Sequence, residues 1–396
     1  MKNISDKSLI FEGKKVLLRV DLNVPMKNGA ITESSRIEKI IPTIKLLIEK
    51  QAKIIILSHI GRPKGKVVKG MSLEPISKKL ASLLNKEVLF NKNIINENTL
   101  SEVNKIQNGS LMMLENIRFN EGEESNNSEF SKKLSNLGDV YINDAFSCSH
   151  RSHASVEGIT RHIPSYFGLQ ITEEVEALKK ITSEIKKPIT LIIGGSKIST
   201  KIKIINNLIK KFNNIIIVGG MANTMLKHTG SKIGKSICEH DCGNLIKEIV
   251  KNSNKYNCKI TCPVDVVVSK NLEDMGKDKD IKEIDDDEMI LDIGPKTISS
   301  IKTIINDSNT VLWNGPAGYF ENPNFQNGTK QILEIISQKT INDKIFSVAG
   351  GGETVAAINK FKKLDSFTFV STAGGAFLEH LEGKTLPGIK ALNQNV

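Results

Sequence analysis

Short runs of apolar, mostly β-branched residues recur along the whole chain, separated by stretches of helical length. Continuous apolar runs are typical of strands buried on both faces, and their alternation with helices predicts parallel α/β sheets. In the first half the runs are Val16–Val20, Ile54–Leu57, Val88–Phe90, Leu111–Leu114 and Val140–Ile142. In the second half they are Ile189–Ile193, Ile215–Val218, Val264–Val268, Val311–Trp313, Ile345–Val348 and Phe367–Val370.

The two sets of runs indicate two domains. A length of 396 residues exceeds what one ordinary core holds. We therefore predict an α/β protein with two doubly wound parallel-sheet (Rossmann-like) domains. An amphipathic stretch, Thr172–Glu184, lies between the two sets and predicts a hinge helix over 171–185. The N-terminal domain then covers 1–170, and the C-terminal domain covers 186–370.

Arginine and glycine are distributed unevenly between the halves. All six arginines lie in the first 161 residues, at Arg19, Arg36, Arg62, Arg118, Arg151 and Arg161. Adjacent glycines lie in the second half, at 194–195, 219–220, 350–352 and 374–375. The guanidinium fork suits carboxylate and phosphate oxygens, whereas paired glycines let backbone N–H groups approach a phosphate chain or a nucleotide ring. This pattern indicates a small-anion domain and a nucleotide domain, with chance clustering of the arginines as the alternative.

Polar clusters follow the apolar runs of the first half. Ligands of open α/β sheets bind beyond the carboxyl ends of the strands, so these clusters are candidate ligand groups. Arg19, Asp21 and Asn23 accompany the first run, and His59 and Arg62 follow the second. Arg118 follows the run at 111–114, and the last run is followed by His150, Arg151 and His153. We interpret Arg19 as a salt bridge at a strand edge, the two histidines as structural or supporting groups, and Arg161 as a surface residue.

Composition and charge exclude several classes of protein. The contents of 39% hydrophobic and 25% charged residues are ordinary for a globular chain. The apolar runs are far shorter than the ~20 residues of a membrane helix, and the amino terminus has no apolar core of signal-peptide length, so we expect a cytoplasmic protein without a membrane partner. The net charge is +11, but there is no run of five basic residues and aromatic residues make up only 5%. Nucleic acid is therefore not an expected partner.

Five cysteines stand at Cys148, Cys238, Cys242, Cys258 and Cys262, and the last four form two C-x3-C pairs. Structural zinc sites usually have the shorter C-x-x-C spacing. We therefore favour reduced, partly buried thiols over a zinc site.

Nine motifs, in order along the chain, resemble those of phosphoglycerate kinases. In the first half they are RVDLNVP (19–25), SHIGRPKG (58–65), LENIRF (114–119) and HRSHAS (150–155). In the second half they are GGSKISTK (194–201), VGGMANT (218–224), WNGPAGYFE (313–321), GGGETVAA (350–357) and STAGGAFLEHLEGKTLPGI (371–389). The resemblance implies reversible phosphoryl transfer between 1,3-bisphosphoglycerate and ADP, giving 3-phosphoglycerate and ATP. It also implies a monomer, and a tail of about 371–396 that packs back on the N-terminal domain.

The resemblance also implies the residues of two ligand sites. Phosphoglycerate would be held by Asp21, Asn23, Arg36, His59, Arg62, Arg118 and Arg151. The nucleotide and its Mg²⁺ would be held by Gly195, Ser196, Lys201, Gly219, Gly220, Asn314, Pro316, Glu321, Gly351, Gly352, Glu353 and Thr354, with Glu353 and Thr354 beside the metal. From their spacing after a glycine turn, we expect Lys197 and Lys201 on one helix face near its positive end. Asp21 and Asn23 as plain turn formers, and the glycine pairs as plain helix starts, are the structural alternatives.

The chain departs from the family pattern at three positions. Glu353 stands where the family usually has Asp, which lengthens the presumed metal-binding carboxylate by one methylene. Ala373 replaces the first of three glycines, and Thr200 stands where many members carry Asp. None of these changes removes a charged group that the reaction requires, so they bear on metal geometry and rate.

The expected mechanism is direct in-line transfer. A P-loop and the H-R-D loop of protein kinases are both absent from the sequence. A carboxylate acceptor is already ionised near neutral pH, so no base is needed. Charge on the moving phosphoryl group would be stabilised by Arg36, Lys197 and the backbone N–H groups of Gly352 and Gly375, after closure about the hinge. A different acyl-phosphate kinase and a catalytically silent binding protein remain the alternatives.

Overall fold

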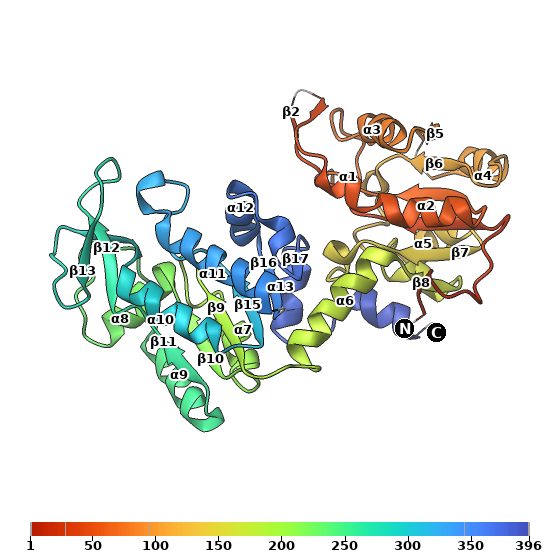
Figure 1. The fold of residues 1–396 in the computed structure, drawn as a ribbon. Helices are drawn as coiled ribbons and strands as arrows, with labels where there is room; N and C mark the ends of the chain where they lie inside the picture. The colour runs from red at the N-terminus through yellow and green to blue at the C-terminus, as the bar shows by residue number, and fades with distance from the viewer. Residues whose placement is uncertain (1, 28, 94, 344, 395–396) are drawn as a thin grey trace. The chain divides into compact units, whose positions relative to one another are not determined.

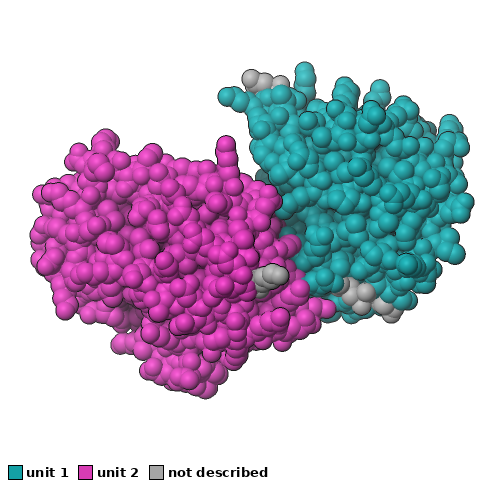
Figure 2. Space-filling model, in the orientation of Figure 1, with its two compact units in different colours: residues 1–176, 385–396 teal, residues 177–384 magenta. Residues whose placement is uncertain are grey.

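The computed structural model describes residues 2–27, 29–93, 95–343 and 345–394. The chain divides into two compact units, which Figure 2 shows in different colours. Unit 1 comprises residues 1–176 and 385–396, and unit 2 comprises residues 177–384. The segment that belongs to unit 1 at the end of the chain thus begins at Thr385, later than the expected position near Ser371.

Unit 1 is built on a six-stranded parallel sheet (Figure 1) in the order β5-β6-β4-β1-β7-β8. The central strands are apolar on both faces and almost fully buried, as the sequence pattern predicts. The strand bounds are β1 Lys15–Arg19, β4 Lys53–Leu57, β5 Val88–Asn91, β6 Leu111–Leu114, β7 Val140–Asn143 and β8 Ser165–Phe167. A short antiparallel hairpin joins β2 Met26–Lys27 and β3 Ala30–Ile31.

The helices of unit 1 begin with familiar start signals. Asn96 and Thr99 form a capping box, and α2 and α3 carry proline in their first turns. The helix bounds are α1 Ser35–Lys39, α2 Ile41–Glu49, α3 Glu74–Leu84, α4 Glu97–Asn104, α5 Ser128–Ser135, α6 Leu169–Thr182 and α14 Pro387–Gln394. The 3₁₀ turns are η1 Ile117–Phe119, η2 Phe146–Cys148 and η3 Gly158–Arg161. The boundary between the two units, after Glu176, falls within α6.

Unit 2 contains a second six-stranded parallel sheet, in the order β11-β10-β9-β15-β16-β17. Its strands are β9 Ile189–Ile193, β10 Asn214–Ile217, β11 Lys259–Thr261, β15 Thr310–Asn314, β16 Phe346–Gly350 and β17 Phe369–Ser371. Its helices are α7 Ile202–Leu208, α8 Gly219–His228, α9 Gly243–Tyr256, α10 Pro295–Asn306, α11 Asn327–Asp343, α12 Gly352–Lys360 and α13 Gly375–Leu381, with turns η4 Pro323–Phe325 and η5 Leu364–Ser366. The prediction of two parallel α/β units is confirmed.

One predicted strand lies in a different sheet from the expected one. The run at 264–268 forms β12 Asp265–Ser269, which pairs antiparallel with β13 Lys277–Asp280 and β14 Met289–Ile293. Val264 is 48% exposed, whereas Val266 and Val268 are buried. Val266 and Val268 share one face of β12 and pack with Ile284 in a small apolar cluster of their own, so the run belongs to this separate antiparallel sheet rather than to the parallel one.

The parallel order decides where ligand groups can gather. The carboxyl ends of all strands in each six-stranded sheet meet at one edge, and the motif residues follow those ends. None of the described helices is long and apolar enough to cross a membrane. All five cysteines are free, and Cys238, Cys242, Cys258 and Cys262 do not enter a three-ligand metal cluster within the described ranges.

Candidate active site

The first cluster lies at the carboxyl edge of the unit 1 sheet and centres on Asp21. Arg36 Nη1 donates to Asp21 Oδ2 at 2.5 Å, and the Ser147 hydroxyl donates to the same oxygen. The other carboxylate oxygen accepts from the Asn23 backbone N–H at 3.0 Å, so the turn-forming role is also present. Asn23 in turn accepts from the Gly61 N–H at 3.0 Å. These bonds orient Arg36 and tie the loops after β1 and β4 together.

Arg118 is a buried member of this cluster whose hydrogen-bonding capacity is only partly used. Its side chain is 2% exposed, and Nη1 donates to Gly61 O at 2.7 Å. Nε lies 3.4 Å from Glu124 Oε1, whereas Nη2 has no hydrogen-bond partner among the described residues. Burial, followed by the charges of Arg151 and Arg19, lowers the pKa of Arg118. A buried guanidinium with an unused donor, close to two like charges, is a site for an anion.

Two further arginines are more accessible. Arg62 is exposed on the loop after β4, and Arg151 is half-buried after η2. Arg151 Nε donates to His150 Nε2 at 3.2 Å, so His150 supports this guanidinium, as the sequence analysis anticipated. Arg161 is exposed and pairs with Glu157 one helical turn away, as expected of a surface residue.

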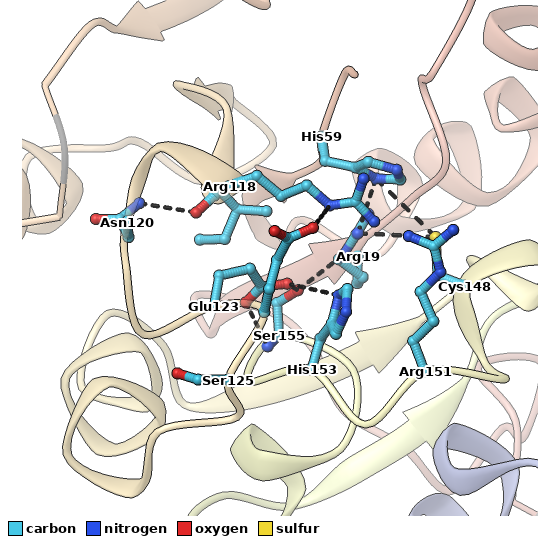
Figure 3. A network of polar contacts seen from close by, with 12 residues as sticks. Arg19, His59, Arg118, Asn120, Glu123, Ser125, Cys148, Arg151, His153 and Ser155 are labelled. Carbon is cyan, nitrogen blue, oxygen red and sulfur yellow. Dashed lines mark hydrogen bonds and ion pairs between the residues drawn. The ribbon is translucent and has the colours of Figure 1, made fainter. Parts of the chain in front are cut away.

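We predicted a salt bridge for Arg19, and this prediction of its partner was wrong. Arg19 is fully buried and forms no ion pair with a described carboxylate; Nη2 lies 3.0 Å from His59 Nδ1 instead. Figure 3 shows this contact beside Ser155, whose hydroxyl accepts from Arg19 Nε at 3.0 Å and donates to Glu123 Oε1 at 2.6 Å. The negative charge of Glu123 therefore reaches Arg19 through one hydroxyl rather than by direct contact.

His153 also belongs to this network. Its Nδ1 lies 3.8 Å from Glu123 Oε1, too far for a hydrogen bond. Burial, followed by the charges of Arg118, Arg19 and Arg151, lowers the pKa of His153 to about 3. The ring is therefore neutral at physiological pH and supports the site without adding charge.

The Asp21, His59 and Cys148 side chains lie close enough together to act as ligands of a cation. However, Arg19 already donates to His59 Nδ1, and Arg36 and Ser147 already bond the carboxylate. Burial raises the pKa of the Cys148 thiol. One carboxylate oxygen and the Nδ1 nitrogen are thus already engaged by guanidinium groups, and the thiol is kept protonated, so the cluster is poorly suited to hold a metal ion.

Unit 2 contains a cavity of about 400 Å³ at the carboxyl edge of its parallel sheet. Seven of the residues that line it come from the predicted nucleotide site: Gly195, Ser196, Gly219, Gly220, Pro316, Glu321 and Glu353. The remaining wall is largely apolar and includes Ile237, Val266, Leu272, Leu291 and Tyr319. An apolar cleft with a few polar groups suits an aromatic base with a polar sugar. Sequence reasoning missed most of this wall because Ile237, Val266, Leu272 and Leu291 come from β12, β14 and connecting loops outside the motifs, whereas Tyr319 lies in the motif at 313–321.

The expected placement of the two lysines was wrong. Lys197 lies in the loop after β9, and Lys201 immediately precedes α7, so the pair does not share a helix face. The loop is held from elsewhere: the Ser199 backbone N–H donates to Glu239 Oε2 at 2.9 Å, and its hydroxyl donates to Oε1. Lys197 is exposed, whereas Lys201 is half-buried and donates to Asn314 Oδ1. Burial lowers the pKa of Lys201, and the charge of Glu353 opposes that shift.

Helix α12 begins within the run of three glycines. Gly351 has a φ of +98°, and a Cβ added there would lie 2.5 Å from Asn314 Nδ2. Asn314 Nδ2 donates to Gly350 O at 2.6 Å, and the Gly315 N–H donates to Thr354 Oγ1 at 2.7 Å. Thr354 is therefore occupied in holding the loop after β15, while Gly352 and Glu353 are exposed.

A second glycine turn precedes α13. Gly374 has a φ of +55°, and Gly375, which is exposed, begins the helix. Gly352 and Gly375 thus occupy equivalent positions, each at the first residue of a helix that follows a strand of the parallel sheet.

Comparison with known proteins connects both clusters to one family. The family profile described as phosphoglycerate kinase matches residues 6–384. The chain is 46% identical over 385 residues to phosphoglycerate kinase of Rhizobium meliloti (strain 1021), covering 96% of each. It is 45% identical over 384 residues to that of Chelativorans sp. (strain BNC1), again covering 96% of each. The solved structure of phosphoglycerate kinase from Coxiella burnetii has a TM-score of 0.91 at 39% identity and covers 99% of this chain and 98% of that one. The chain belongs to the phosphoglycerate kinase family.

Proposed function

We propose that unit 1 binds the phosphoglycerate, unit 2 binds the nucleotide, and the phosphoryl group passes directly between them. Membership of the family makes the chain a glycolytic kinase that interconverts 1,3-bisphosphoglycerate and ADP with 3-phosphoglycerate and ATP. The observation that carries the division is Arg118, whose buried Nη2 has no described partner and lies in a cluster of like charges. Such a group is stabilised by an anion with several oxygens, which phosphoglycerate supplies.

On the substrate side, we assign the phosphate and carboxylate oxygens to the guanidinium groups and the hydroxyl to the loop after β1. The ligand set is Asp21, Asn23, Arg36, His59, Arg62, Arg118 and Arg151. Asp21 and Asn23 offer oxygens for a substrate hydroxyl, and Asp21 also orients Arg36.

On the nucleotide side, we assign the base and ribose to the cavity wall and the phosphates to the glycine turns. Gly195, Gly219, Gly220, Asn314, Pro316 and Glu321 belong to the first group, and Ser196, Lys201, Gly351, Gly352, Glu353 and Thr354 to the second. Mg²⁺ is commonly held by one or two carboxylates together with substrate phosphates. The exposed carboxylate of Glu353 at the cavity fits that donor set, and the ion would neutralise charge on the nucleotide phosphates.

Four groups would stabilise the phosphoryl group during transfer: Arg36, Lys197 and the backbone N–H groups of Gly352 and Gly375. The acceptor is an ionised carboxylate, so the protein has to position and neutralise charge rather than remove a proton. We further propose a hinge in α6 that closes the units over the substrates and excludes water from the acyl phosphate. By family resemblance, we also infer a monomeric, cytoplasmic enzyme.

A coupled assay of 3-phosphoglycerate with Mg-ATP tests the assignment. The parent and Glu353→Asp should turn over, whereas Lys197→Ala should lose at least about 100-fold in kcat, because it lacks a cation at the moving phosphoryl group. Lys203→Ala, an exposed lysine on α7, is the matched control and should behave like the parent.

Other outcomes would point elsewhere. Activity restored only in Glu353→Asp would mean that the longer carboxylate misplaces the metal. Turnover with other carboxylates but not with 3-phosphoglycerate would indicate a different acyl-phosphate kinase. No turnover in any variant, with ligand binding intact, would indicate a binding protein.

A further inference from the structure

Each of the three guanidinium nitrogens of Arg19 contacts a different partner. Nη1 donates to Val20 O, Nε donates to Ser155 Oγ at 3.0 Å, and Nη2 lies 3.0 Å from His59 Nδ1 (Figure 3). A guanidinium carries only donors, in a planar fork, and keeps its proton at any physiological pH. The direction of the Arg19 to His59 hydrogen bond is therefore fixed by chemistry: Arg19 donates and His59 Nδ1 accepts.

This direction determines the state of the imidazole. A ring nitrogen that accepts a hydrogen bond carries no proton, so the proton of neutral His59 must be on Nε2. We propose that Arg19 is a positioning residue that holds His59 in the Nε2–H tautomer, so that His59 meets phosphoglycerate as a neutral hydrogen-bond donor. The substrate part of this proposal rests on the proposed function of unit 1.

The surroundings of His59 exclude the doubly protonated ring as well. Burial is the main cause that lowers the pKa of His59 well below its ordinary value, and Arg19, Arg118, Arg151 and His153 add to the shift. The Cys148 thiol lies 4.0 Å from Nδ1 and is itself kept protonated by burial. Asp21 is neutralised by Arg36. Among the described residues, the hydrogen-bonding contacts of the ring are all at Nδ1, which leaves Nε2–H for a ligand.

Arg19 is itself locked by a buried chain of hydrogen bonds. Ser155 donates to both oxygens of Glu123, from its hydroxyl at 2.6 Å and from its N–H at 2.9 Å. Tyr141 OH donates to Ser155 O at 2.6 Å, and Glu123 O accepts from the Ala154 N–H at 2.9 Å. Because the Ser155 hydroxyl proton is used on Glu123, its oxygen is free to accept from Arg19. The chain therefore fixes both the charge balance and the orientation of the guanidinium.

The tautomer matters because the ligand is an anion. An Nε2–H points a donor at a carboxylate, phosphate or hydroxyl oxygen, whereas the other tautomer would point a lone pair at it. Loss of one charge-assisted hydrogen bond costs about 1.5–3 kcal/mol. That corresponds to an increase of about 10- to 100-fold in the KM for 3-phosphoglycerate, with the KM for ATP unchanged.

Nitrogen-15 NMR of histidine-labelled protein reads the tautomer directly, without any substitution. At pH 7 the long-range proton–nitrogen pattern of His59 should be that of an Nε2–H ring, and adding 3-phosphoglycerate should shift the Nε2 proton. The exposed ring of His162 provides an internal reference for an imidazole that exchanges between its two tautomers. A proton on Nδ1, a doubly protonated ring, or an Nε2 signal unmoved by saturating substrate would each overturn the proposal.

Two substitutions of His59 give a second, functional readout. The amide of Gln can place an N–H near the Nε2 position, whereas the shorter amide of Asn reaches only the Nδ1 position beside Arg19. His59→Gln should therefore keep a lower KM for 3-phosphoglycerate than His59→Asn, and equal losses would contradict the tautomer role. A parent without turnover would contradict the proposed function instead, since the NMR pattern needs no turnover.

Discussion

The two proposed ligand sites of this protein differ in the groups that form them. The site in unit 1 consists of charged side chains, several of them buried, that hold one another in place through hydrogen bonds. The site in unit 2 consists of backbone at glycine turns and of apolar walls, with few charged groups. Phosphoglycerate offers almost no apolar surface, so it must be bound through charge. A nucleotide offers a flat base and a phosphate chain, which apolar walls and helix starts can accept.

The two sites should therefore differ in the substitutions that they tolerate. Side chains of the first site should tolerate few substitutions without loss of substrate affinity, whereas the second should be most sensitive where a Cβ cannot fit. The following experiments test that contrast.

Replacing Arg118 by Met should have the largest effect. It removes the buried guanidinium with the unused donor, so kcat/KM for 3-phosphoglycerate should fall by roughly 100- to 10,000-fold, the value of two charge-assisted hydrogen bonds. The free energy of unfolding should change far less, because relief of repulsion from Arg151 and Arg19 offsets the lost bond to Gly61. Steady-state kinetics and urea unfolding measure the two. Arg161→Met is the control, and an equal loss there would contradict the assignment.

Replacing Gly351 by Ala should damage the nucleotide site selectively. The added Cβ meets both a φ of +98° and Asn314 Nδ2 at 2.5 Å. We expect the KM for ATP to rise by about 5- to 150-fold, while the KM for 3-phosphoglycerate stays the same, since strain of this kind costs about 1–3 kcal/mol. Gly230→Ala has a φ of +91° and open space around the added atom, so it isolates the cost of the backbone conformation. If the KM for ATP rose equally in both variants, the contact between the added Cβ and Asn314 Nδ2 would not explain the loss.

Replacing Glu239 by Ala should have a moderate effect on turnover. Glu239 accepts both hydrogen bonds of Ser199, so its loss frees the loop that carries Lys197. We expect kcat to fall about 3- to 10-fold with little change in either KM, because positioning rather than binding is lost. Ser199→Ala and the double variant complete a thermodynamic cycle, and fully additive effects would show that the two residues act separately. Glu248→Ala, which removes an exposed carboxylate that accepts from Asn206, is the control.

The last prediction concerns the pH dependence of stability, which has opposite signs in the two units. In unit 1, the folded pKa of His153 is lowered to about 3, below its unfolded value near 6.5, so its contribution to stability is lost as pH falls through this window. In unit 2, burial raises the pKa of Asp292 to about 7, so its contribution is lost as pH rises from about 4 to about 7. Each slope is at most about 1.4 kcal/mol per pH unit.

Unit-specific probes separate the two slopes. Trp313 is the single tryptophan and is buried in unit 2, so its fluorescence follows the unfolding of that unit. Exchange of backbone amides in β1 and β7 follows unit 1. His153→Gln should remove part of the loss in unit 1 on acidification to pH 5, and carbon-13 NMR should place the titration of Asp292 near pH 7. A midpoint near 4 would contradict the effect of burial.

The strands were predictable because a strand that is buried on both faces appears in the sequence as a continuous apolar run. Runs such as Leu111–Leu114 and Ile189–Ile193 match their strands residue for residue. The polar clusters at their carboxyl ends could be picked out as candidates once the parallel order was assumed, whereas the roles of single residues came from the family resemblance and stay predictions. Short edge strands such as Ser165–Phe167 left too little apolar pattern to be seen.

The errors have a common cause, which is contact between residues far apart in the chain. Lys197 and Lys201 were placed on a helix from local spacing, but Glu239 holds the loop from 40 positions away and α7 starts later. Arg19 was expected to find a carboxylate nearby, yet its partner is the neutral ring of His59, also 40 positions away. Local patterns report burial and turns well, but they carry no information about which distant side chain completes a hydrogen bond.

On the proposed assignment, an anionic substrate bound among the cations around Arg118 would stabilise the folded state of unit 1. A ligand that binds only the folded state adds stability in proportion to the logarithm of its concentration, about 2.7 kcal/mol at a hundred times its dissociation constant. On the proposed assignment of the substrate to unit 1, phosphoglycerate would therefore protect the folded unit against transient opening, and the protection would fade as the ligand is diluted.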